Sequence, residues 1–287
     1  MRGTRHVFAT VIWAAALFSL ISCSSLTGDS NGTGPGQTDT PAAEAVLVYH
    51  LPFNEGEGTT AHDATGNGPD AVVSGAEWTA GPRGGALEFD GTDDFVAVEA
   101  PPSLADLGQG SISVWFRADH IPQNFGMRPI FYYGKDGVCP KTFDASNAGL
   151  IIELGHSPIH PGSDWLYFTI FANGCTYPSF CYDSRRDVTL DEWHHFVAVV
   201  GPDYNTGYFD GEEMTSRWYN FGNASYSQFL EDAVEHEALW IGRGYWDEEP
   251  MYFDGAIDDV RVYSGPLSAR EVAELYDGTV RRPGHRD

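Results

Sequence analysis

From residue 46 onward the chain is a succession of short apolar runs separated by turn residues, and this pattern restricts the possible folds most strongly. Each run has the length of a strand and is rich in Val, Ile, Phe, Tyr or Trp. No run has the spacing of a βαβ unit, and no internal repeat is evident. We therefore predict an all-β chain in which two antiparallel sheets form a sandwich of jelly-roll type. The runs are 46–53, 86–90, 94–99, 111–118, 129–134, 149–154, 165–172, 193–201, 206–211, 238–244 and 257–263.

The last run, IDDVRVY, contains two consecutive aspartates. Side chains of a regular strand alternate between faces, so Asp258 is expected on the same side as Val260 and Val262. A carboxylate at the rim of an apolar face is costly unless a partner compensates its charge. In a chain rich in acidic oxygens, a hard cation such as calcium suits that role.

The segment after this strand has the signals of a capped helix. Ser268 is placed as the N-cap, and Glu271 stands three residues later as its capping-box partner. Val272, Leu275 and Tyr276 form one apolar stripe at helical spacing. We predict one short helix here, and no other segment after the leader carries a comparably strong helix signal.

The first residues have the features of a secretory leader. Arg2 and Arg5 precede an apolar run over 7–21 that is too short to span a bilayer comfortably, which predicts a signal peptide over 1–22. The run ends in Leu-Ile-Ser-Cys, which resembles the lipobox of bacterial lipoproteins, whose cysteine becomes the lipidated N-terminus. That resemblance implies lipidation at Cys23. The alternative is an ordinary cleaved signal with an incidental cysteine.

The expected domain plan follows from these boundaries. Residues 23–45 are mostly Gly, Ser, Thr and Pro, which predicts a flexible tether. A single folded domain is expected over 46–278, followed by a tail over 279–287. Because Ser24 rather than Asp follows the lipobox cysteine, the resemblance implies an extracytoplasmic protein anchored to the outer membrane, where the host has one. Contact with a membrane is expected through the lipid anchor only.

Three cysteines remain after the leader. An oxidising compartment favours pairing of two of them, and Cys175 with Cys181 is the easiest closure. Cys139 is then the simplest residue to be left as a free thiol. The sequence does not fix the connectivity.

The charge balance restricts the possible partners. The chain has 41 Asp and Glu residues against 16 Lys and Arg residues, which gives a net charge of −25. This balance argues against nucleic acid or an anionic surface as partner. Acidic glycans are expected to be repelled unless a cation bridges them.

Seven motifs in order give the chain a family resemblance. Their order is similar to that of the laminin G-like, concanavalin A-like jelly-roll domains of secreted bacterial proteins, and the resemblance covers about 46–278. The motifs are FNEGEGTTAHDATGNGPDA (53–71), GGALEFDGTDDFVAV (84–98), SISVWFRAD (111–119), DEWHHFVAVV (191–200), YFDGE (208–212), LWIGRG (239–244) and FDGAIDDVRVYSGPLSAREVAELYDG (253–278).

The resemblance implies a structural calcium ion between the loop after the first strand and the closing strand. Its expected ligands are Asp63, Asn67 and Asp258, with carbonyl oxygens near Gly66 and Gly68. Oxygen donors on a glycine-flexed loop suit the six to eight oxygen ligands that calcium takes. The alternative is that Asp63 and Asn67 only cap a turn.

Patterns typical of catalytic sites and of histidine-based metal sites are not found in the sequence. The E-x-D-x-x-E pattern of related glucanases is absent, and the phosphate-loop and nucleophile-elbow motifs are absent too. His194 and His195 lack further ligands at matching spacing and are expected to pack within a strand. Catalysis is therefore disfavoured, and no catalytic residue is assigned.

Exposed aromatic residues in loops are the expected ligand-binding groups, because sugar rings stack on aromatic faces. The alternative is that these loop residues tuck over the edge of the sandwich. Non-catalytic binding of a glycan or other cell-surface ligand is the predicted function; a glycan-degrading enzyme and a protein-protein adhesion or scaffold module are the two alternatives. The candidate binding residues are Trp218, Tyr219, Asn220, Tyr245 and Trp246.

Overall fold

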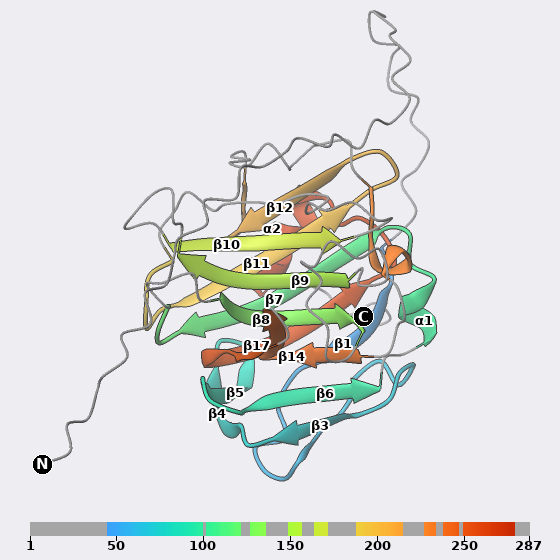
Figure 1. The fold of residues 1–287 in the computed structure, drawn as a ribbon. Coiled ribbons are helices and arrows are strands. Elements are labelled where there is room, and N and C mark those ends of the chain that lie inside the picture. Colours follow the sequence, from blue (N-terminus) through green and yellow to red (C-terminus); the bar gives the residue numbers. More distant parts are fainter. Residues whose placement is uncertain are drawn as a thin grey trace, which may run out of the picture. The chain divides into compact units, whose positions relative to one another are not determined.

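Two antiparallel sheets make up the folded part of the chain in this computed structural model, and they lie one in front of the other (Figure 1). All described residues fall within the unit formed by residues 39–287. The structure describes residues 45–99, 102–121, 127–135, 149–156, 164–171, 188–214, 227–233, 238–246 and 249–278.

The first sheet has eight strands in the order β13–β12–β11–β7–β17–β5–β4, with β1 also paired to β17. One side of β17 is shared, because its first residues pair with β5 and its last residues pair with β1. The strands are β1 (Leu47–Leu51), β4 (Glu77–Gly81), β5 (Gly84–Asp90), β7 (Gly110–Ala118), β11 (Trp193–Val200), β12 (Asn205–Phe209), β13 (Glu212–Glu213) and β17 (Asp254–Tyr263).

The second sheet has seven strands in the order β10–β9–β8–β14–β6–β3–β2. A separate hairpin, β15 (Arg243–Trp246) with β16 (Glu249–Tyr252), packs against β8. The strands of this sheet are β2 (Thr60–Ala61), β3 (Ala71–Ser74), β6 (Phe95–Glu99), β8 (Met127–Gly134), β9 (Gly149–His156), β10 (Asp164–Phe171) and β14 (Ala238–Ile241).

The main core lies between the two sheets and draws on alternate residues of their strands. Ile112, Val114 and Phe116 of β7 face it, and Phe131 of β8 and Phe168 of β10 face it from the second sheet. Each pairing between described strands is antiparallel, for example β7 with β11 and β8 with β9. The predicted antiparallel two-sheet sandwich is confirmed.

The predicted helix is α2 (Ala269–Asp277), and its N-terminal cap is the one expected. The Ser268 hydroxyl accepts from the Glu271 amide, while the Glu271 carboxylate accepts from the Ser268 amide. Val272 and Leu275 are buried in a small cluster with Val197 and Tyr263, which places α2 on the outer face of the first sheet. The described residues also contain two shorter elements, α1 (Pro102–Ala105) and η2 (Leu230–Asp232). Within the described residues no helix is long and apolar enough to span a membrane.

Two local features differ from the predicted strands. The run 238–244 is divided at Gly242, whose φ of +79° turns the chain out of the second sheet and into the hairpin. The second difference is a β-bulge in β17, where the three steps from Asp258 to Arg261 oppose only two steps of β7. The extra residue falls at Asp259, which has a φ of +53°.

The bulge corrects the expectation for Asp258. This residue pairs with Trp115, whose ring stacks on Tyr276 of α2, so Asp258 lies on the outer face of the sheet. Val260 and Val262 face the main core instead. The prediction that Asp258 shares their side was wrong because regular alternation does not continue through a bulge.

Candidate functional site

The outer face of the second sheet carries a cluster of aromatic side chains. Trp240 alternates with the core residues Leu239 and Ile241, so its ring points away from the main core. It stacks on Tyr132 of β8 with ring centroids 5.2 Å apart, and the tilted ring of Tyr245 in β15 has its centroid 5.4 Å from that of Trp240. We call Tyr132, Trp240 and Tyr245 the aromatic cluster.

The backbone of the hairpin brings Tyr245 onto this face. The Gly242 amide donates to the Ile130 carbonyl at 3.0 Å, and the Gly242 carbonyl accepts from the Phe253 amide at 2.8 Å. Gly244 sits so close to the sheet that a Cβ there would meet Pro129 Cγ at 2.9 Å. A residue with a side chain would therefore push the hairpin away from the sheet.

Arg243 lies among the rings of this face. Its guanidinium carbon is 4.5 Å from the centroid of Trp240 and 4.7 Å from that of Phe95. Tyr245 and Tyr252 are 5.2 and 5.9 Å away on other sides. These distances are in the range of cation–π attraction, which holds the guanidinium over the rings.

The hydrogen bonding of Arg243 is incomplete. Its Nη2 donates to the Tyr245 hydroxyl at 2.5 Å, whereas its Nε is buried and has no acceptor. Among the residues described, no Asp or Glu forms an ion pair with it, although the chain is strongly acidic. A cationic donor is thus presented on an aromatic surface, with no counter-ion from the described part of the chain.

A second arginine lies beside the hairpin. Arg128 donates through Nη1 to the Tyr252 carbonyl at 3.1 Å, and its Nη2 is 4.0 Å from Asp254. The Nε of Arg128 is also buried without an acceptor. Burial lowers the pKa of Arg128, and the nearby Asp254 charge opposes that effect. Both arginines therefore contact Tyr252, one through its carbonyl and the other through its ring.

The accessible part of this face lies at its edge. Tyr245 is 8% exposed and Trp240 5%, so the aromatic cluster itself is largely covered. Phe95, Tyr252 and Arg243 remain partly exposed. These three side chains, which we call the Arg243 edge, lie beside the aromatic cluster and are open to a ligand without rearrangement of the described residues.

The face also contains a buried carboxylate, Glu153 of β9, next to Ile151. A retaining glycanase needs two carboxylates about 5 Å apart. The direct neighbours of Glu153 across the strands are Tyr167 and Pro129, and on its own strand they are Ile151 and Gly155. None of these positions supplies a second carboxylate, so the described strands do not form a glycanase pair around Glu153.

The three predicted calcium ligands are not brought together. Asp63 lies in the loop after β1, where its carboxylate accepts from the backbone amides of His50, Thr65, Asn67 and Gly68 and from the Thr65 hydroxyl. Its two oxygens are thereby filled with donors. Asn67 is exposed and donates its own amide to Asp63 rather than facing a shared centre.

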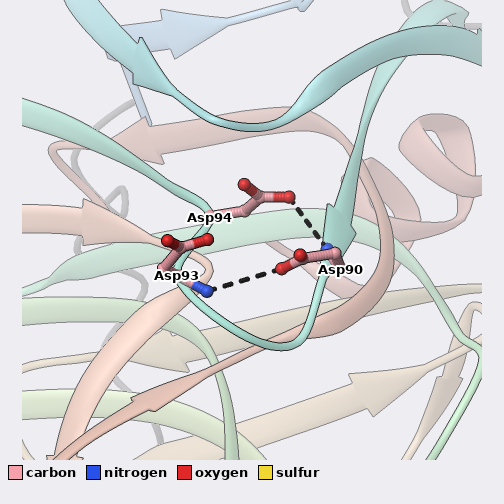
Figure 2. Close-up of side chains that lie close together, drawn as sticks. All are labelled: Asp90, Asp93 and Asp94. Carbon is pink, nitrogen blue, oxygen red and sulfur yellow. Dashed lines mark hydrogen bonds between the residues drawn. The ribbon is translucent and has the colours of Figure 1, made fainter.

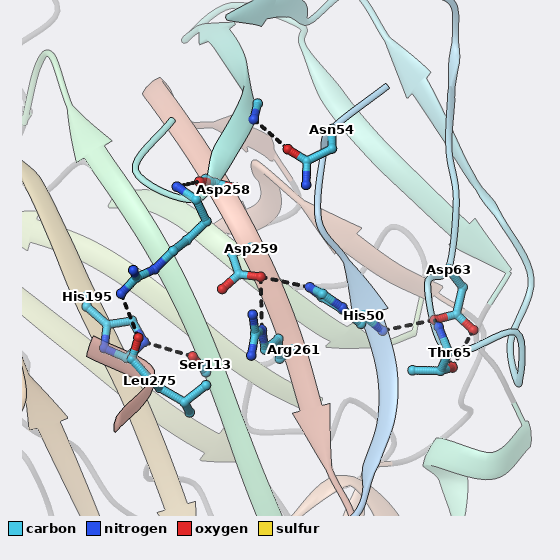
Figure 3. Close-up of polar contacts among 12 residues, drawn as sticks. His50, Asn54, Asp63, Thr65, Ser113, His195, Asp258, Asp259, Arg261 and Leu275 are labelled. Carbon is cyan, nitrogen blue, oxygen red and sulfur yellow. Dashed lines mark hydrogen bonds and ion pairs between the residues drawn. The ribbon is translucent and has the colours of Figure 1, made fainter. Parts of the chain in front are cut away.

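Asp258 lies apart from Asp63, on the far side of Asp259 and His50 (Figure 3). Its Oδ2 accepts from the Arg83 amide at 2.9 Å, and its Oδ1 is buried without a partner. Burial raises the pKa of Asp258 to about 7. The arrangement does not fit one cation held by all three residues, and the contacts of Asp63 are those of the turn-capping alternative.

His50 connects the two regions. Its amide donates to Asp63 at 2.9 Å and its Nε2 lies 2.7 Å from Asp259, which also pairs with Arg261 (Figure 3). Burial alone would raise the pKa of Asp259, but the hydrogen bond from His50 and the Arg261 charge outweigh it and lower the pKa. This chain of contacts fastens the loop after β1 to the closing strand.

Three carboxylates do gather in the turn between β5 and β6. Ligand oxygens of Asp90, Asp93 and Asp94 lie within 4.8 Å of one another (Figure 2). Asp94 accepts from the Asp90 amide, and Asp90 accepts from the Asp93 and Thr92 amides. These bonds are those of a tight acidic turn, and such turns are common on protein surfaces without an ion.

The histidine pair packs within β11. His195 is buried against Trp115 and its Nε2 lies 2.8 Å from the Ser113 hydroxyl. Burial lowers the pKa of His195 to about 3, so the ring is neutral. His194 contacts Asp210 at 2.9 Å. Neither ring joins a group of metal ligands among the described residues.

Several predicted residues lie outside the described part of the chain. They are Trp218, Tyr219, Asn220, Cys23, Cys139, Cys175 and Cys181. The backbone of Trp246 belongs to β15, but its side chain is not described. Tyr245 is therefore the one predicted binding residue whose side chain the structure describes.

Sequence reasoning missed Arg243 and Trp240. Both lie in LWIGRG, a segment that the sequence pattern predicts to be one strand and that is also a family motif. Two features of the sequence indicate that these residues could lie on a functional surface. Trp240 stands between Leu239 and Ile241, in the phase of the strand that faces away from the core, and Arg243 is one of few cations in an acidic chain.

Comparisons with known proteins agree with this architecture. The family model of the concanavalin A-like lectin/glucanases superfamily matches residues 90–273. No curated protein matches the chain.

Solved structures give the same result. Domain 4 of AbnA, an extracellular arabinanase from Geobacillus stearothermophilus solved with arabinotriose, is 19% identical, with a TM-score of 0.58 over 82% of this chain and 100% of that domain. Trypanosoma rangeli sialidase in complex with sialic acid is 16% identical, with a TM-score of 0.55 over 80% of this chain and 32% of the sialidase. The receptor-binding domain of botulinum neurotoxin C/D mosaic serotype is 13% identical, with a TM-score of 0.52 over 81% of this chain and 51% of that chain. At these identities the likeness concerns the fold alone.

Proposed function

The chain belongs to the concanavalin A-like lectin/glucanases superfamily, and from that premise we propose that it binds glycans without cleaving them. The Arg243 edge, formed by Phe95, Arg243 and Tyr252, is the proposed contact surface. A sugar presents an apolar face of C–H groups and a rim of hydroxyl groups. Partly exposed aromatic rings beside a free cationic donor offer a partner to both.

One observation carries the proposal: the partly exposed Arg243 side chain lies over four rings and, among the described residues, pairs with no carboxylate. The exposed donors of its guanidinium can form a charge-assisted hydrogen bond to a ligand oxygen, which is stronger than a bond between neutral groups. Likeness to a domain solved with arabinotriose is consistent with a saccharide ligand but names none for this chain.

Binding rather than cleavage is favoured by the surroundings of Glu153. None of the positions next to it in the strand register is Asp or Glu. Hydrolysis by paired carboxylates needs a second carboxylate at about 5 Å in the retaining mechanism or somewhat farther in the inverting one. Release of reducing sugar or of unsaturated product from a bound polysaccharide would support the enzyme alternative instead.

The test compares two tyrosine variants of the full-length protein on a glycan array and by calorimetry. Tyr252→Ala removes a ring of the Arg243 edge, whereas Tyr204→Ala removes a 41% exposed tyrosine between β11 and β12 in the first sheet. We expect Tyr252→Ala to weaken binding about tenfold, the value of a lost aromatic contact, and Tyr204→Ala to leave it unchanged. Equal affinities for both variants and the parent protein would remove this surface from the proposal.

The same experiment separates the third function class. A blank array together with capture of a defined surface protein would indicate an adhesion or scaffold module. Binding of a glycan that Tyr252→Ala weakens supports the lectin-like function.

We also propose that the protein is held at a bacterial membrane by a lipid on Cys23. Support comes from the leader and its lipobox resemblance, since Cys23 lies outside the described residues. Labelling with a palmitate analogue is expected to mark the parent protein and not Cys23→Ser. Equal labelling of both proteins would contradict the anchor.

Calcium binding is kept as a separate proposal that rests on the family resemblance and on the acidity of the chain. We expect a chelator to lower the melting temperature and added calcium to restore it. Indifference to both would remove the ion from the account. The glycan proposal does not depend on this result.

A further inference from the structure

Arg243 differs from the other described arginines in its partners. Three arginines are paired with carboxylates, one contacts carbonyl oxygens of α2, and Arg128 contacts the Tyr252 carbonyl near Asp254. Arg243 has the Tyr245 hydroxyl as its one acceptor among the described residues. The carboxylate-paired arginines are Arg117, Arg261 and Arg270, and the arginine at α2 is Arg83.

Within the described residues Arg243 has no carboxylate as counter-ion, which is unexpected for this protein. The chain carries 41 acidic residues against 16 basic ones, so a carboxylate is the most available partner for any guanidinium. The surface around Arg243 is nevertheless built from rings, and Arg128, which also contacts Tyr252, has Asp254 at 4.0 Å from its Nη2. Among the described residues, no carboxylate neutralises the guanidinium of Arg243 in the same way.

The geometry of a guanidinium restricts what completes this site. Its nitrogen atoms form a planar fork that matches the two oxygens of a carboxylate. In Arg243 the Nε is buried, so a ligand meets the Nη edge of the fork, where Nη2 already donates one hydrogen to the Tyr245 hydroxyl. A carboxylate is the anion whose two oxygens match such an edge, and the rings of Phe95 and Tyr252 lie beside the guanidinium, where a sugar can contact them.

We propose that the glycan bound here carries a carboxylate, as in a uronic acid, and that Arg243 selects it. This inference rests on the proposed glycan-binding function and adds the chemical class of the ligand. The net charge of −25 strengthens the dependence on one residue, because an acidic glycan meets long-range repulsion from the rest of the protein. Removal of the guanidinium should abolish recognition of the acid and spare contacts with neutral sugar faces.

The experiment measures calorimetric affinities of the full-length protein for two matched ligands, oligogalacturonate and its methyl ester. The ester keeps the sugar faces and removes the charge. We expect the acid to bind at least tenfold more tightly than the ester. Arg243→Met, which keeps an apolar stem over the rings, should lose that preference, and Arg243→Lys should keep only part of it.

Arg270→Gln is the matched control, because Arg270 is 87% exposed on α2 and lies on the outer side of the first sheet. The preference of Arg270→Gln for the acid over the ester should equal that of the parent protein. Melting temperatures of all variants establish that they are folded. A folded Arg243→Met variant with an unchanged preference for the acid would overturn the assignment.

Two further outcomes separate this inference from the proposed function. If the protein binds the ester and neutral glycans and shows no preference for the acid, selection of a carboxylate by Arg243 is contradicted, and the proposed glycan-binding function is unaffected. Binding to no glycan at all contradicts both. Dextran sulfate and dextran form an additional pair of ligands. If the protein prefers the sulfated polymer and does not bind oligogalacturonate, Arg243 recognises a sulfate ester, and the proposal of a carboxylate ligand is overturned.

Discussion

Two adjacent aspartates in β17 have opposite electrostatic environments. Asp259 is paired with His50 and Arg261, which lowers its pKa, whereas burial raises that of Asp258 to about 7. The bulge makes this possible, because it places both side chains on the outer face of the first sheet. Asp258 accepts the Arg83 amide there, at the point where β5 ends and β1 begins along β17.

The raised pKa of Asp258 predicts a pH-dependent stability. The unfolded chain releases this proton near pH 4 and the folded chain near pH 7, so this group makes the protein less stable as the pH rises between those values. The full effect is on the order of 4 kcal/mol. Asp258→Asn keeps an acceptor for the Arg83 amide and removes the titration.

Urea denaturation at pH 5 and pH 8 measures this effect. The gain in unfolding free energy from Asp258→Asn should be larger at pH 8 than at pH 5. A gain or loss that is the same at both values would show that Asp258 is not buried in this way. Because Asp259 is intact in both proteins, its own titration cancels in the comparison.

The contribution of Asp63 to stability changes with pH in the opposite direction to that of Asp258. Burial alone would raise its pKa, but hydrogen bonds from Thr65, Gly68 and His50 lower it, so its contribution to stability is present at neutral pH and is lost in acid. Asp63→Ala leaves several amides unpaired and should cost about 2–4 kcal/mol at pH 7. Asp93→Ala, at an exposed turn, is the control and should change the unfolding free energy by less than about 1 kcal/mol. Similar costs for the two variants at pH 7 would contradict the anchoring role of Asp63.

At the scale of single elements, α2 is fastened at both ends. Ser268 and Glu271 cap its first turn, and the Arg83 guanidinium donates to the carbonyl oxygens of Leu275 and Tyr276 in its last turn. The same guanidinium lies 4.8 Å from the ring centroid of Trp115. A nine-residue helix is too short to be stable alone, so these contacts and its buried stripe hold it on the sheet.

The cap makes a measurable prediction. Ser268→Ala removes the acceptor for the Glu271 amide and should reduce the unfolding free energy by about 1 kcal/mol, while Ser268→Asp retains an acceptor and should be close to the parent protein. Chemical denaturation at pH 7 measures both. Equal losses for the two substitutions would show that the side-chain acceptor at 268 does not stabilise the helix.

The elements that the sequence predicts depend on residues close together in the chain, whereas those it missed depend on contacts between distant segments. The helix was predictable because Ser268, Glu271 and Val272 act within two turns of one another. The bulge was not, since it arises where β5 and β1 meet on one side of β17, a long-range property. The aromatic cluster depends likewise on Gly242 turning the chain, so a run that looks like one strand divides and places Arg243 over Trp240.

For the molecule as a whole, the two outer faces of the sandwich have different surroundings. The outer face of the first sheet is packed by α2 through Val272 and Leu275. The outer face of the second sheet holds the hairpin, the aromatic cluster and two arginines with an unpaired Nε. The aromatic and cationic groups of the proposed binding surface therefore lie on the second sheet, whereas the outer face of the first sheet is packed by the helix.

The location of a bound saccharide tests the central claim most directly. We propose a crystal structure of the full-length protein with an oligosaccharide that binds in solution. Density for a sugar ring against Tyr252 and Phe95, with a ligand oxygen within hydrogen-bonding distance of the Arg243 guanidinium, is the predicted result. A saccharide bound on another face, with the Arg243 edge empty, would contradict the account.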